Sequence, residues 1–170
     1  KNVGDRRVPG LYDIVGFGLN LRMSELAAAI GIEQLKKLPN FLKVRRSNIF
    51  TLTSNFDSSF GSFIKYECDF GVSSNYCASF VLEPKYLPLR DQIILELKNL
   101  GIICSVYYPV ALPDSSYYKS NPKISRSLGA PNARYLANSS VAFGIGPHLS
   151  EEDMLYVREK FDFVLKRVLS

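Results

Sequence analysis

The sequence of 170 residues has no tryptophan, one histidine and only three cysteines. The cysteines form no CxxC pair and their number is odd, which argues against a disulfide scaffold or zinc knuckle and favours a reducing cytoplasm. His148 alone supplies too few imidazoles for a histidine-built metal site, so no metal is expected. The apolar runs are too short to cross a bilayer and no charged-then-apolar leader opens the chain, so no membrane association is expected.

Composition places the chain among ordinary globular proteins, because 46% of its residues are hydrophobic and 22% are charged. One domain is the default at this length. The net charge is +5, but the basic residues are scattered and no basic stretch alternates with aromatics as in a nucleic-acid groove. The excess fits a solvated surface, which we favour, or an anionic ligand such as a phosphate ester.

The first third of the chain predicts a long helical arm. Residues 1–21 are irregular and suggest that the chain begins in the middle of a protein. Apolar residues at helical spacing predict a helix over residues 22–38. Pro39 is expected to end this helix and to start a second one that reaches Asn55. The apolar face of the arm needs another surface to pack on.

The remaining two thirds predict a small α/β layer structure with helices over a sheet. Ser150 and Asp153 have the spacing of a capping box at the start of a last helix. A stripe of five apolar residues, Met154, Val157, Phe161, Val164 and Val168, predicts the buried face of this helix. The other expected elements are strands 64–70, 76–82, 102–107 and 141–145 and helices 88–100 and 132–139.

Few residues suggest catalysis, and no catalytic residue is assigned. His148 is interpreted as a turn or capping residue, and the acids after Ser150 as partners of the helix dipole. Tyr107, Tyr108, Tyr117 and Tyr118 could line a pocket, although tyrosines at strand ends usually pack with the hydroxyl in water.

Asn20 and Arg22 stand at a loop-to-helix junction, where free amides of the following helix favour an anion. Asparagine offers an amide donor, and arginine offers a planar charged fork suited to phosphate. The same two residues equally fit an asparagine in a turn and an arginine on the surface, so physics alone leaves both interpretations open.

Four segments, in order along nearly the whole chain, carry a family resemblance. They are Gly18-Leu-Asn-Leu-Arg-Met with its alanine-rich helix and Gln34-Leu-Lys-Lys-Leu, the pair Arg45-Arg46, Val106-Tyr-Tyr-Pro, and Gly146-Pro-His-Leu-Ser-Glu-Glu-Asp. Together they resemble the C-terminal part of DegT/DnrJ/StrS-type sugar aminotransferases, which use pyridoxal 5'-phosphate (PLP).

This resemblance implies a fold class and a division of the chain. The fold is expected to be α/β, the small C-terminal domain of a fold-type I PLP-dependent transferase preceded by a long helical arm. Residues 1–21 correspond to a loop remnant of the large cofactor domain, residues 22–56 to the arm and residues 57–170 to the small domain. The Schiff-base lysine of the family lies upstream of this region, so the chain alone is expected to be inactive.

The resemblance also implies ligands and partners. The whole enzyme would aminate a keto group of a nucleotide-linked sugar, usually with glutamate as amino donor, for polysaccharide or glycosylated natural-product synthesis. It would be a homodimer with shared active sites. By motif match, Asn20 reaches the cofactor phosphate of the neighbouring subunit, Arg22 serves the cofactor or substrate side, and Tyr107 and Tyr108 line the substrate cleft.

Three departures from the family pattern concern substrate details. Tyr107 stands where histidine is common, Leu19 where an aromatic is usual, and Phe143-Gly-Ile where Leu-Pro-Ile is usual. Two other functions stay open. One is a PLP-dependent sugar dehydratase of the same family, with the lysine replaced. The other is a non-catalytic binding or dimerisation module.

Overall fold

The computed structural model describes residues 16–19, 21–56, 59–65, 69–121 and 129–169. The chain divides into two compact units, Lys1–Lys36 and Lys37–Ser170. The first unit contains an extended segment and the start of helix α1 (Glu25–Thr53), and the second contains the rest of that helix and all other elements. No helix within the described ranges has both the length and the apolar character that a membrane span requires.

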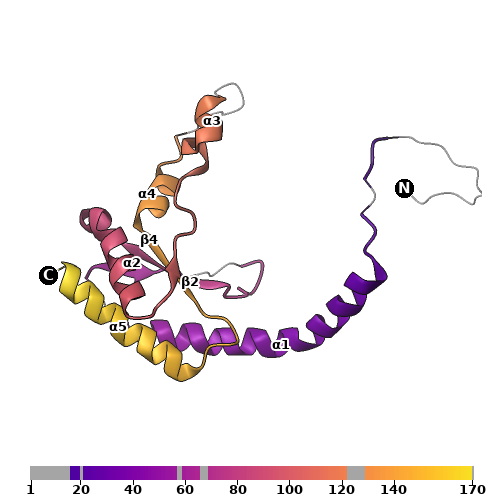
Figure 1. Ribbon diagram of the computed structural model, residues 1–170, viewed down its shortest axis with the longest axis horizontal. Helices are drawn as coiled ribbons and strands as arrows, with labels where there is room; N and C mark the ends of the chain where they lie inside the picture. Colours follow the sequence, from indigo (N-terminus) through magenta and orange to yellow (C-terminus); the bar gives the residue numbers. More distant parts are fainter. Residues whose placement is uncertain (1–15, 20, 57–58, 66–68, 122–128, 170) are drawn as a thin grey trace, which may run out of the picture. The chain divides into compact units, whose positions relative to one another are not determined.

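A four-stranded antiparallel sheet forms the centre of the second unit (Figure 1). Its order is β1-β2-β4-β3, with bounds β1 (Gly61–Phe63), β2 (Cys77–Leu82), β3 (Cys104–Ser105) and β4 (Ser140–Gly144). In register, Phe80 of β2 stands opposite Val141 of β4, and Cys104 of β3 opposite Phe143 of β4. The start of β2, the start of β3 and the end of β4 therefore lie next to one another, at the same end of these three strands.

Helices join and cover the strands. A 3-10 turn η1 (Pro84–Leu89) leads into α2 (Arg90–Asn99), and η2 (Leu112–Asp114), α3 (Ser116–Ser120) and α4 (Pro131–Ser139) lie between β3 and β4. The last helix is α5 (Glu151–Leu169). The sequence-predicted order of strand, strand, helix, strand, loop, strand and helix is confirmed, and with it the α/β class of the small domain.

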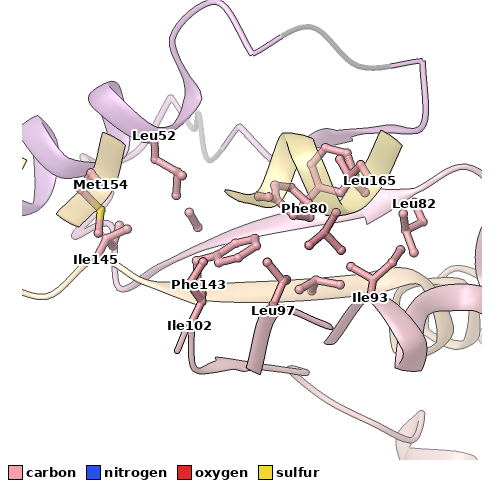
Figure 2. Packing of buried hydrophobic residues seen from close by; sticks show 14 residues of the cluster. Leu52, Phe80, Leu82, Ile93, Leu97, Ile102, Phe143, Ile145, Met154 and Leu165 are labelled. Carbon is pink, nitrogen blue, oxygen red and sulfur yellow. The ribbon is translucent and has the colours of Figure 1, made fainter. Parts of the chain in front are cut away.

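The core lies where α2, α5 and the end of α1 pack on the sheet (Figure 2). Alternate residues of β2 face it, because successive side chains of a strand point to opposite faces. Six phenylalanines belong to it or pack against it, and Phe161 of α5 lies in ring contact with four of the others: Phe56, Phe63, Phe80 and Phe143. The centroids of Phe161 and Phe143 are 4.8 Å apart.

Two predicted elements are wrong. Pro39 does not divide the arm, because α1 continues through it to Thr53. An interior proline removes one helical hydrogen bond and leaves the carbonyl of Leu35 without its donor. Leu35 is 66% exposed, so water can reach this part of the helix and replace the missing donor.

The first strand is also misplaced. It was predicted at 64–70, but β1 is Gly61–Phe63, Ile64 and Lys65 lie outside it, and residues 66–68 lie outside the described ranges. Gly61 fixes this register, because a Cβ there would collide with the carbonyl oxygen of Val81 on the paired strand. Phe63 then packs against Phe80, at a centroid distance of 5.2 Å.

The start of α5 is a capping box, as predicted. The Ser150 hydroxyl accepts a hydrogen bond from the Asp153 amide at 3.1 Å, and the Asp153 carboxylate accepts one from the Ser150 amide at 2.7 Å. The predicted stripe is largely confirmed, since Met154, Phe161 and Val164 are fully buried. Val157 and Val168 are only partly buried and pack against the core.

We predict that the capping box stabilises the protein in a pH-dependent way. Backbone and side-chain hydrogen bonds from Ser150 lower the pKa of Asp153. The stabilisation is therefore complete above the ordinary aspartate pKa and is lost as the pH falls through the lowered value. Ser150→Ala should reduce the free energy of unfolding by about 1 kcal/mol at pH 7. Urea unfolding of Asp153→Ala should match the wild type only at strongly acidic pH. Glu152→Gln, in the same turn, should retain the wild-type loss of stability on acidification.

A second prediction compares two phenylalanines of α5. Phe161 is fully buried, whereas Phe163 is 51% exposed. Phe161→Ala should lower the free energy of unfolding by about 3–5 kcal/mol, because it leaves a cavity among four rings. Phe163→Ala, which removes the same atoms, should cost much less. Equal losses in chemical denaturation would contradict the packing described here.

Candidate functional site

A pocket of about 300 Å³ lies in the second unit, at the end of the sheet where β2 and β3 start and β4 ends. The antiparallel pairing brings these three ends together. The polar or ionisable side chains that line the pocket are Arg45, Tyr76, Cys77, Cys104, Ser105, Tyr107 and His148. No aspartate or glutamate is found among the described lining residues. The pocket therefore combines a cation with several hydroxyl groups.

Two tyrosines meet at this pocket. Tyr107, a predicted site residue, is 44% exposed, and its ring centroid lies 6.2 Å from that of Tyr76. Electrostatic interaction with Tyr107, followed by a side-chain hydrogen bond to it, raises the pKa of Tyr76. Its hydroxyl therefore stays protonated at neutral pH and can donate a hydrogen bond. Sequence reasoning missed Tyr76 as a site residue. It lies next to Tyr107 only because β2 and β3 both pair with β4.

Tyr108, also predicted at the site, contacts Tyr107 but does not line the pocket. Its ring centroid lies 5.9 Å from that of Tyr107, and the residue is 75% exposed. Tyr117 and Tyr118 pack on each other in α3 and do not line the pocket either. Of the four tyrosines considered from the sequence, only Tyr107 lines it.

Arg45 reaches the pocket from the second half of α1. Its Nε is buried and has no hydrogen-bond partner among the described residues. The next residue, Arg46, is exposed. The sequence presented the two arginines as an equivalent pair, and the helix places only Arg45 against the pocket.

The loop after β4 forms the wall that carries His148. Asn48, buried in α1, donates from Nδ2 to the carbonyl oxygens of Gly146 at 3.2 Å and Leu149 at 3.1 Å. A Cβ on Gly146 would lie 2.6 Å from Cε1 of His148, so a larger residue there would require the exposed imidazole to turn aside. His148 is an exposed turn residue before the cap of α5, as predicted.

The pocket thiols do not form a reactive pair. Cys77 and Cys104 are both free. Burial raises the pKa of Cys104, so its thiol is protonated at neutral pH and is a weak nucleophile. Cys68 lies outside the described residues. Within the described part of the chain, no group of three or more histidine, cysteine or acidic side chains could hold a metal ion.

The predicted cofactor residues belong to the first unit. Asn20 lies outside the described residues, and Arg22 is exposed in the segment before α1. Ser24 starts the helix by accepting a hydrogen bond from the Ala27 amide at 3.3 Å. Several large apolar side chains of this unit are also exposed, among them Phe17 (97%), Leu21 (85%) and Leu26 (74%).

The chain belongs to the DegT/DnrJ/EryC1/StrS aminotransferase family, whose model matches residues 2–162. UDP-4-amino-4,6-dideoxy-N-acetyl-beta-L-altrosamine transaminase of Campylobacter jejuni is 27% identical over 161 residues, 92% of this chain and 40% of that protein. GDP-4-keto-6-deoxy-D-mannose 3-dehydratase of Escherichia coli is 37% identical over 87 residues, 51% of this chain and 22% of that protein.

Among solved structures, the candidate sugar aminotransferase Spr1654 of Streptococcus pneumoniae superposes with a TM-score of 0.79 at 27% identity. The match covers 94% of this chain and 39% of that one. Structures of Spr1654 are also known in a PLP form and in a form with PMP, the amine form of the cofactor. The chain thus spans well under half the length of these relatives.

We predict that Asn48 holds the pocket wall. Asn48→Ala should lower the free energy of unfolding by about 2–3 kcal/mol, because two carbonyl groups lose their donor. Amide signals of residues 146–149 should shift in NMR spectra. Asn40→Ala, at an exposed position of the same helix, should change neither quantity appreciably. Unchanged signals at 146–149 in Asn48→Ala would contradict this role.

Proposed function

We propose that this chain is the C-terminal part of a PLP-dependent aminotransferase that aminates a keto group of a nucleotide-linked sugar, with glutamate as amino donor. The observation that carries the proposal is the extent of the match. The family model covers residues 2–162, and one transaminase relative aligns over 92% of the chain. The free thiols of Cys77 and Cys104 are compatible with the cytoplasmic location that we propose.

In this proposal the two units have different tasks. Asn20 and Arg22 would bind the cofactor phosphate, and Tyr107 and Tyr108 would line the substrate cleft. The division into a loop remnant (1–21), an arm (22–56) and a small domain (57–170) is part of the same proposal. The chain itself contributes no catalytic residue and is expected to be inactive alone, because the Schiff-base lysine of the family lies upstream.

The donor chemistry of the first unit fits a phosphorylated cofactor. Arg22 is exposed, and its guanidinium is a planar donor that binds phosphate oxygens in pairs. Bound PLP supplies an electron sink for chemistry at an amine-bearing carbon. In the pocket, the Tyr76 and Tyr107 hydroxyls can donate hydrogen bonds to sugar or phosphate oxygens and so orient a substrate.

We also propose that the partner of the first unit is a second copy of the enzyme. Phe17, Leu21 and Leu26 expose more than 70% of their surface. Large apolar side chains that are exposed close together in the sequence favour an interaction site. A homodimer with shared active sites would cover these side chains and bring Asn20 and Arg22 to the cofactor of the neighbouring subunit.

One observation favours a second candidate, the sugar 3-dehydratase of the same family. The Escherichia coli dehydratase is 37% identical to this chain, whereas the Campylobacter transaminase is 27% identical. The higher identity covers only 51% of the chain, against 92% for the transaminase. We therefore favour aminotransfer. A non-catalytic binding or dimerisation module is the remaining alternative.

The test uses the whole protein that contains this chain. With glutamate and a nucleotide-linked keto sugar, an aminotransferase yields an amino sugar and 2-oxoglutarate. A deoxygenated sugar without nitrogen would instead identify a dehydratase, and the absence of both products together with no PLP binding would identify a binding module. Mass spectrometry of the sugar product separates these outcomes.

Arg22→Gln tests the assignment to the cofactor. It should raise the PLP concentration needed for half-saturation about tenfold, because a charge-assisted hydrogen bond to phosphate is lost. PLP absorbance reports this titration. Lys37→Gln removes the same charge from an exposed position of α1 and should leave PLP binding unchanged. Equal effects of both variants would refute a specific role of Arg22.

A further inference from the structure

Arg45 lines the pocket, and within the described part of the chain its buried Nε has no acceptor. Arginine remains charged under all ordinary conditions, so it cannot avoid this cost by losing a proton. An unsatisfied buried donor costs free energy, and nearly all such groups in folded proteins have partners. Because Arg45 also lines the pocket, an anion bound there would lie beside the guanidinium and offset this cost.

The surroundings of Arg45 favour an anionic acceptor. The described lining contains no carboxylate that would neutralise the guanidinium. It does contain the hydroxyl groups of Tyr76, Ser105 and Tyr107. A cation that shares a pocket with hydroxyl donors is suited to phosphate or carboxylate oxygens.

We propose that Arg45, together with the Tyr76 and Tyr107 hydroxyls, forms an oxyanion subsite that binds a phosphate or carboxylate group of a substrate. The proposal rests on the proposed function, which offers two sources of such a group: the diphosphate of the nucleotide sugar and the carboxylates of the amino donor. The pocket volume of about 300 Å³ is large enough for one charged group with its neighbouring atoms.

The neighbouring arginine provides a matched control. Arg46 carries the same charge one residue later but is exposed and does not line the pocket. General attraction of anions by the net charge of +5 would be weakened equally by loss of either residue. Binding at the proposed subsite would instead be weakened by loss of Arg45 and not by loss of Arg46.

The experiment titrates the full chain with inorganic pyrophosphate and, separately, with glutamate and 2-oxoglutarate, at fixed low ionic strength. NMR shifts of the Gly144 and Gly146 amides report binding at the pocket. Arg45→Gln should weaken binding at least tenfold and Arg46→Gln less than twofold. Arg45→Lys should fall between them, because lysine keeps the charge without the planar fork.

The outcomes separate the two sources and the alternatives. Saturable pocket shifts with pyrophosphate alone assign the diphosphate, and shifts with the carboxylates alone assign the amino donor. No binding of any probe, or equal weakening by Arg45→Gln and Arg46→Gln, overturns the subsite. Thermal unfolding is measured in parallel. A large loss of stability in Arg45→Gln with unchanged affinity of the folded protein would overturn it in favour of a structural role.

Failure of this subsite can be distinguished from failure of the proposed function. The identity of the sugar product and PLP binding are measured on the wild-type whole protein, without any Arg45 variant and without the anion titrations. An active aminotransferase whose chain binds none of these anions at the pocket would retain the function and lose the subsite.

Discussion

The burial of Phe161 among four other phenylalanine rings is the interaction on which the second unit depends. The rings come from α5, β1, β2, β4 and Phe56, three residues after the end of α1, so one cluster joins five parts of the chain. Most of these ring contacts are edge-to-face. Such contacts stabilise the fold beyond the area they bury, and they favour particular orientations of the two rings. The cluster therefore determines which elements meet and how they are oriented. It also holds in position the strands whose ends form the pocket.

The pocket is a consequence of how the sheet ends. Antiparallel pairing brings the starts of β2 and β3 next to the end of β4, and α1 adds Arg45 from outside the sheet. Asn48 ties the same helix to the loop after β4 through two hydrogen bonds. Arg45 thus stands on a helix, and Tyr76 and Tyr107 stand within two residues of strands β2 and β3.

Much of this architecture could be predicted from the sequence. The capping box and apolar stripe of α5 are local patterns, and local physics determines them. The strand 64–70 was wrong because alternation alone does not show which strand is the partner, whereas Gly61 and Phe63 are selected by contacts with β2. Pro39 was misread because a helix tolerates an interior proline where water reaches the freed carbonyl.

The candidate site was only partly predictable, for the same reason. Tyr107 was found through a resemblance. Its neighbour Tyr76, and the burial of the Arg45 Nε without a partner among the described residues, depend on contacts between distant segments. Asn20 and Arg22 were chosen by motif, and they stay predictions. Sequence patterns therefore identified the family and most of its elements. Which residues line the pocket could be seen only in the folded structure.

Two glycines of the pocket differ in what they permit, and this bears on how such a site can diversify. A side chain at position 146 would meet the ring of His148, so a substitution there requires the imidazole to move. A Cβ at Gly144 meets no atom within 4 Å, although the residue lines the same pocket. Position 144 is therefore free to vary, and a larger residue there can narrow the pocket while the strand beneath it stays intact. Ligand selectivity can thus evolve at one position without loss of the fold.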